Sequence, residues 1–135
     1  MAFQIADSHF QFVGRWFTTT NNSGATLTQS TTADDGATWS PQFNTANTVE
    51  AERAQVNAYI MANKTRDMVV AANPTFPTVA TQASTFQVNC NLANTCNAYY
   101  TGNTINFYLA GGGCANTAFG DVVAHEFGHN VVAKG

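Results

Sequence analysis

The sequence predicts an α+β domain in which helices pack on a mixed sheet. Runs rich in aromatic and β-branched residues occupy much of 10–40 and 85–110. Helical patterns cover residues 48–72 and 121–133. The order of strands, helix, strands and helix is typical of the α+β class. A chain of 135 residues is also long enough for one domain with a buried core.

The first block contains two strand-like runs separated by a turn. The runs are FQFVGRWFTTT and ATLTQSTT, and the NNSG sequence between them has the composition of a tight turn. We therefore expect one strand on each side of this turn. The DDG sequence at 34–36 is expected to end the second strand.

The helix expected over residues 48–72 has a signal at each end. Asn47 is the expected N-cap, and Glu50 follows it at the spacing of a capping box. The NPTFP sequence stops the helix, because the residue before a proline avoids helical backbone. A mostly apolar stripe at helical spacing is expected to face the core: Val56, Tyr59, Ile60, Asn63, Asp67 and Val70.

The third block returns to strand patterning before a last helix. TFQVNCNL alternates, and the TGN sequence between NAYY and TINFYLA predicts a hairpin. GGGCANTAFG then leads into the last helix, for which Asn116 or Thr117 is the expected N-cap.

Composition excludes two classes of partner. Five Lys and Arg residues and a net charge of −3 give no basic surface for nucleic acid. No apolar stretch is long enough to span a membrane.

The composition also bears on where the protein is located. Charged residues make up 10% of the chain, against a usual fraction of about 25%. A surface of hydroxyls and amides is common in secreted proteins, so we expect an extracellular protein. Since MAFQIADSHF is not a signal peptide, we expect any signal to be removed or upstream.

Three cysteines leave at least one thiol unpaired within the chain. A bridge between Cys96 and Cys114 would close the apolar segment that they flank. The alternative is that Cys90, Cys96 and Cys114 are three small buried side chains.

The last helix contains the sequence HEFGH, which has the residue types of a zinc site. His125 and His129 are four residues apart, so both rings lie on one helix face and can aim at one metal ion about 2.0–2.1 Å away. Glu126 can reach a water held by that metal and act as a general base. The alternative is two core histidines with satisfied hydrogen bonds. His9 is either a packed or exposed histidine or a further ligand.

Several motifs together resemble the thermolysin-like zinc proteases, a group of gluzincins that includes the fungalysin-like enzymes. GDVVAHEFGHNVV resembles their active-site helix, CNAYYTGNTINFY resembles their substrate-binding strand pair, and TVEAERAQVNAYIMANKTRD resembles their long helix. The resemblance covers about residues 48–135. It implies a zincin-like N-terminal lobe with a β-rich segment at 1–47 and a helix–sheet–helix catalytic segment at 48–135.

The resemblance also implies roles for five residues. His125 and His129 would bind Zn2+, and Glu126 would be the base. Asn97 and Ala98 would lie on an edge strand that pairs with an extended peptide or protein substrate.

The third ligand has no counterpart in the sequence. In the thermolysin-like group it is a glutamate on a later helix, followed by a histidine that stabilises the transition state. We therefore expect the C-terminal lobe to be absent, and that lobe to complete the site. The expected function is that of a secreted zinc metalloendopeptidase, with little activity for residues 1–135 alone. The alternatives are a non-catalytic zinc-binding remnant and a secreted β-rich binding module.

Overall fold

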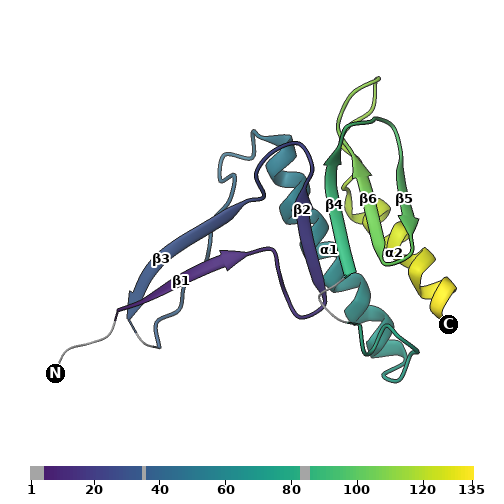
Figure 1. Cartoon of the computed structure of the whole chain (residues 1–135), viewed down its shortest axis with the longest axis horizontal. Helices are drawn as coiled ribbons and strands as arrows, with labels where there is room; N and C mark the ends of the chain where they lie inside the picture. Colours follow the sequence, from purple (N-terminus) through teal and green to yellow (C-terminus); the bar gives the residue numbers. More distant parts are fainter. Residues whose placement is uncertain (1–4, 35, 83–85) are drawn as a thin grey trace.

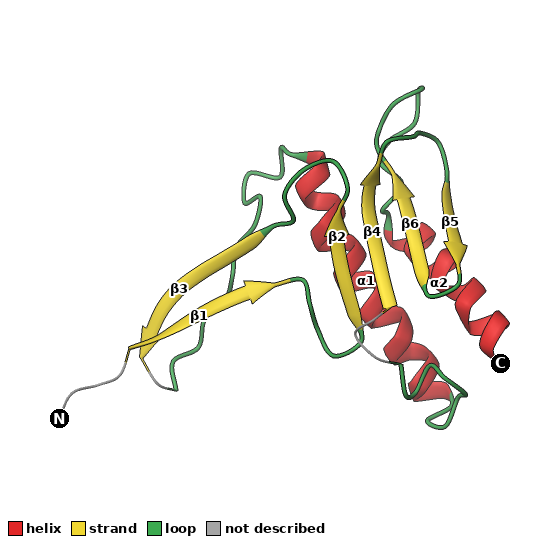
Figure 2. Cartoon of the chain, in the orientation of Figure 1, coloured by secondary structure: helices red, strands yellow, loops and turns green. Residues whose placement is uncertain are grey.

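The predicted α+β class is confirmed. A computed structural model describes residues 5–34, 36–82 and 86–135 of the chain (Figure 1). Both helices lie on the same face of the larger sheet (Figure 2). The elements are, in chain order, β1 (Ile5–Gln11), β2 (Phe17–Asn21), β3 (Thr28–Asp34), α1 (Glu50–Ala72), β4 (Phe86–Leu92), β5 (Ala98–Thr101), β6 (Thr104–Tyr108) and α2 (Gly120–Lys134).

The larger sheet is mixed and has the strand order β2-β4-β6-β5. Strands β2 and β6 run parallel to β4, whereas β5 and β6 form the antiparallel hairpin that the TGN sequence predicts. This order leaves β5 at an edge of the sheet, next to α2. Strands β1 and β3 form a separate antiparallel ribbon, which projects to one side of the larger sheet (Figure 1).

The expectation for the first block is wrong in one respect. FQFVGRWFTTT is not one strand, because the chain leaves β1 and then enters β2 in the other sheet. NNSG does form a turn, but β2 and β3 on its two sides do not pair with each other. The break falls at Gly14, where a side chain would collide with the hydroxyl of Tyr59 on α1. A larger residue would require the Tyr59 side chain to move, so glycine allows this close approach of the backbone to that ring.

The face of α1 that packs on the sheet consists of small residues. Ala54, Ala58 and Ala62 are buried, whereas Ile60 in the expected stripe is 44% exposed and Asp67 is exposed. The expected stripe is therefore only partly right, because Tyr59 and Val70 pack against the core whereas Ile60 and Asp67 do not. Alanines at four-residue spacing bring the helix close to the sheet, and the core forms between them and the strands.

The start of α1 also differs from the expected capping box. Val49 is the N-cap and makes no side-chain cap hydrogen bond, and Asn47 has a left-handed φ of 53°. The preceding amides of Thr48 and Val49 each donate to Oδ1 of Asn44 at 3.1 Å. Glu50 accepts a 2.9 Å hydrogen bond from the amide of Asn116, so it fixes a distant loop to the helix instead.

The end of α1 and the start of α2 give one confirmation and one correction. Helix α1 ends at Ala72, just before the NPTFP sequence that was expected to stop it. Helix α2 begins after Phe119, which is its N-cap, so the expectation of Asn116 or Thr117 is wrong. Oδ1 of Asn116 accepts from the amide of Ala118, ahead of the helix. Neither helix of the described residues is long and apolar enough to cross a membrane.

Candidate metal centre and cleft

Helix α2 is oriented by an aromatic cluster beneath it. Phe127 is fully buried and makes edge-to-face contacts with Phe17 of β2 at 5.4 Å and Phe86 of β4 at 5.5 Å. Residues two positions away along a helix point to nearly the opposite side. Burial of Phe127 therefore turns His125 and His129 outward, and both are exposed.

The two histidine rings converge across one turn of α2. Their Nε2 atoms are 3.1 Å apart, and the rings are perpendicular with centroids 4.7 Å apart. Two nitrogens bound tetrahedrally to zinc at 2.0–2.1 Å lie about 3.3–3.4 Å apart, so the pair needs little movement to hold the ion. Because both rings are exposed, they are not core histidines. Tyr100 of β5 stacks on His129 at 6.5 Å and supports that ring from the edge strand.

A cleft of about 440 Å³ lies beside this pair, between α2 and the start of β5. Glu126 faces it from α2 and is 6% exposed, so its carboxylate is largely removed from bulk water. The lining side chains supply an imidazole, two carboxylates, an amide and a hydroxyl: Cys96, Asn97, Ala98, Thr117, Asp121, Val122, His125 and Glu126.

The structure brings Asn97 and Ala98 into the same cleft as His125 and Glu126. Ala98 is the first residue of β5, and Asn97 precedes it. One side of β5 pairs with β6, and its other side is the edge of the sheet. An edge of this kind can accept a further strand.

Two cleft residues were missed as site residues from the sequence. Asp121, in the first turn of α2, lines the cleft. Thr117 was considered only as a cap, yet its hydroxyl donates to the carbonyl of Asn97 at 2.9 Å. No local sequence signal indicates this hydrogen bond, because it joins residues on opposite sides of the β5–β6 hairpin.

His9 is not brought to the cleft. It lies on β1 of the separate ribbon, where Nδ1 contacts the hydroxyl of Ser30 at 2.5 Å and Nε2 contacts the amide of Gln11 at 2.9 Å. Over residues 5–34, 36–82 and 86–135, no group of three or more His, Cys, Asp or Glu is placed to hold a metal. Among the described residues, His125 and His129 are the imidazoles that lie close enough together to share one ion.

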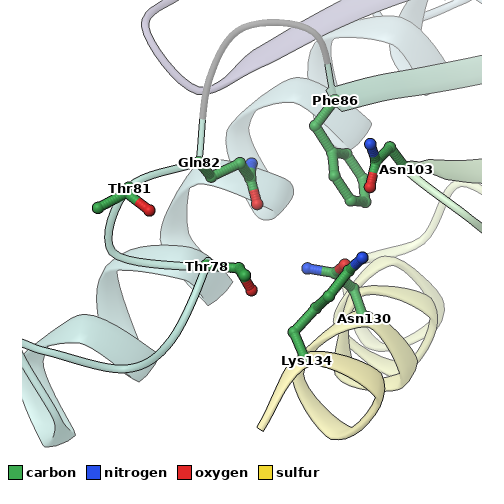
Figure 3. Close-up of a pocket in the computed structure, with 7 residues that line it drawn as sticks. All are labelled: Thr78, Thr81, Gln82, Phe86, Asn103, Asn130 and Lys134. Carbon is green, nitrogen blue, oxygen red and sulfur yellow. The ribbon is translucent and has the colours of Figure 1, made fainter.

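A second cavity, of about 280 Å³, lies near the C-terminal end of α2 (Figure 3). Its described lining residues offer hydroxyls, amides and one ammonium group. Its lining residues are Thr78, Thr81, Gln82, Phe86, Asn103, Asn130 and Lys134.

Two of the three cysteines form a disulfide, and the third is a free thiol. Cys96 and Cys114 form a disulfide, so that alternative was right. Cys90 is free and fully buried on β4, and burial raises the pKa of its thiol to about 12. A thiol in this state is neither a metal ligand nor a nucleophile near neutral pH.

The sequence matches the family model described as "Thermolysin metallopeptidase, catalytic domain" over residues 2–133. The match spans the β-rich segment as well as the helix–sheet–helix segment. Searches of curated proteins and of solved structures gave no match.

Proposed function

Because the chain belongs to the thermolysin metallopeptidase family, we propose that it is a zinc-dependent endopeptidase, with His125 and His129 as zinc ligands and Glu126 as the base. The observation that supports this proposal best is the pair of imidazole nitrogens 3.1 Å apart, beside a cleft that Glu126 lines. The chemistry that zinc supplies when bound is polarisation of the scissile carbonyl and acidification of a water molecule.

The chain's own carboxylate would move the proton. Glu126 follows His125 on α2 and faces the same cleft, within reach of a water beside the imidazole pair. It would take a proton from that water and pass it to the amine nitrogen that leaves.

The substrate in this proposal is an extended peptide. It would lie along the edge of β5 as an additional strand, with its backbone bound by Asn97 and Ala98. This places the peptide between the edge strand and α2, across the imidazole pair. The low charge of the chain gives no reason to expect a strongly charged substrate.

A third protein ligand is needed for a working site, since catalytic zinc has three protein ligands and one water. We propose that a glutamate from a C-terminal lobe supplies it, as the family resemblance implies. Residues 1–135 alone would then bind zinc weakly and hydrolyse peptides negligibly. A secreted location is part of the same proposal, and the Cys96–Cys114 disulfide supports it, because such bridges persist in oxidising compartments.

The test compares the wild type with Glu126→Gln in a protein that includes the further lobe. The assay is cleavage of a quenched peptide library with zinc, with and without a chelator. We expect chelator-sensitive cleavage by the wild type and a loss of about 10²- to 10⁴-fold in the variant. Zinc content should stay unchanged, because the histidines remain, and His9→Ala should cleave normally.

Other outcomes would identify a different function. Cleavage that is indifferent to Glu126→Gln would sink the mechanism. Zinc binding without any cleavage would identify a non-catalytic zinc-binding protein, the second candidate.

A further inference from the structure

A disulfide lies at the end of the cleft that is lined by Asn97 and Ala98. Cys96 directly precedes Asn97, and Cys114 lies on the loop that leads to Thr117 and α2. The bridge therefore joins the start of the edge strand to the loop that forms another part of the cleft wall. Cys96 is exposed and itself lines the cleft, so a small reagent can reach the bond.

The backbone at this point is held by few bonds. Sheet pairing of β5 starts only at Ala98, opposite Phe107, so Asn97 lies outside the ladder. Cys96 has a left-handed φ of 62°, a conformation that a non-glycine residue keeps only when its surroundings hold it. The disulfide holds Cys96 itself, and the Thr117 hydroxyl holds the carbonyl of the next residue, Asn97.

Thr117 connects Asn97 to the interior strand β6. Its hydroxyl donates to the Asn97 carbonyl at 2.9 Å and accepts from the amide of Tyr108 at 2.8 Å. One side chain therefore ties the approach to β5 to the last residue of β6. Valine has nearly the same shape as threonine but can make neither hydrogen bond.

The third cysteine cannot replace either partner of the bridge. Cys90 is fully buried, and its sulfur contacts the carbonyl of Ala54 on α1 at 3.7 Å. Thiol–disulfide exchange requires an accessible thiolate, which this residue does not provide. Opening the Cys96–Cys114 bond therefore does not lead to a new pairing with Cys90.

We propose that the Cys96–Cys114 disulfide and the Thr117 hydroxyl are positioning groups, which hold Asn97 in place for peptide binding, so that reduction of the bridge weakens peptide affinity. The peptide as ligand rests on the proposed function. With the bond open, each binding event must first order the start of β5, and that entropy cost lowers the affinity. A trialkylphosphine is a suitable reductant: the S–S bond breaks, water supplies oxygen to the phosphine and two protons to the sulfurs, and two thiols and a phosphine oxide result.

The first test measures binding of a short capped peptide without a metal-binding group to the zinc-loaded chain by calorimetry. We expect the affinity to fall about tenfold in a Cys96→Ser, Cys114→Ser double variant and in phosphine-treated wild type. Thr117→Val should weaken binding and Thr117→Ser should restore it. Phosphine should not affect the double variant, and zinc content should be equal throughout. Equal peptide affinity in the wild type and the double variant would overturn the proposal.

The second test needs neither zinc nor peptide. Amide hydrogen exchange of those β5 amides that donate to β6 should be about tenfold faster in the double variant, because local opening of β5 becomes easier. Amides of β4 are the internal control and should keep their rates. Equal exchange at these β5 amides would show that the bridge positions nothing. If the wild type binds zinc but no peptide, the proposed substrate strand fails, and this exchange measurement alone decides the positioning role.

Discussion

The side-chain amide of Asn116 donates a 2.6 Å hydrogen bond to Oδ1 of Asn91, and both side chains are buried. Asn91 in turn donates to Oδ1 of Asn21 and to the carbonyl of Ala51, each at 2.9 Å. These bonds join β2, β4, α1 and the loop that enters α2. The network therefore fixes the loop before α2, the helix that carries the imidazole pair, to the sheet and to α1.

Removal of Asn91 should destabilise the whole domain. In Asn91→Ala, Asn116 and the carbonyl of Ala51 lose a buried partner, which we expect to lower the free energy of unfolding by about 1–3 kcal/mol. The left-handed φ of 59° at this position adds to the loss, since alanine tolerates it poorly. Urea denaturation measures the change. Asn94→Ala, at an exposed position, is the control, and equal stability of the two variants would contradict the network's role.

Zinc uptake should depend on α2 and not on the ribbon. We expect His125→Ala with His129→Ala to abolish uptake, and each single change to weaken it, because one imidazole cannot hold the ion alone. His9→Ala should bind zinc as the wild type does. Elemental analysis after gel filtration provides the measurement. Equal zinc content in the wild type and the double variant would rule out this centre.

Replacing a buried alanine of α1 by a larger residue should lower the stability of the protein. Ala58 is fully buried against the sheet, so Ala58→Leu must displace the helix or the strands. Overpacking of this kind lowers stability by about 1–3 kcal/mol. Met68→Leu, at a position 72% exposed on the same helix, should change stability by less than about 0.5 kcal/mol. Thermal denaturation of both variants tests this, and equal midpoints would show that the interface is loosely packed.

Cys90 should make stability fall at alkaline pH. Burial raises the pKa of its thiol from 9.0 to about 12, so the folded state favours the neutral form. The resulting stabilisation is fully present below pH 9 and is lost as the pH rises towards 12. Denaturation curves of the wild type and Cys90→Ala should therefore converge across this window. At pH 8 a thiol reagent should label Cys90 in urea but not in the folded protein, and equal labelling rates would contradict the burial.

The sequence predicts the features that depend on neighbouring residues. The end of α1, the β5–β6 hairpin and the helix that contains HEFGH all follow from local signals: proline, a glycine turn and helical spacing of two histidines. The convergence of His125 and His129 also follows, since helix geometry alone places them on one face.

Features set by contacts between distant segments do not follow from the sequence. Alanine is compatible with either face of a helix, so hydrophobicity favoured Ile60 over Ala58 for the core. The bond from Thr117 to Asn97 depends on how the hairpin packs beside α2. The break between β1 and β2 at Gly14 is explained by the close contact of this glycine with the Tyr59 side chain of α1, which the sequence does not reveal.

The parallel pairing of β2 with β4 also governs how the chain reaches its native state. The whole of β3 and α1 separates the two strands in sequence, so closing this loop costs entropy before any pairing is gained. Chains dominated by such non-local pairing fold in about milliseconds to seconds. On the ribosome, β2 emerges first, and its Phe17 lacks its ring partners Phe86 and Phe127 until β4 and α2 have been synthesised. A chain that stalls before β4 therefore presents an unpaired strand and one uncovered aromatic ring to chaperones, proteases and other nascent chains.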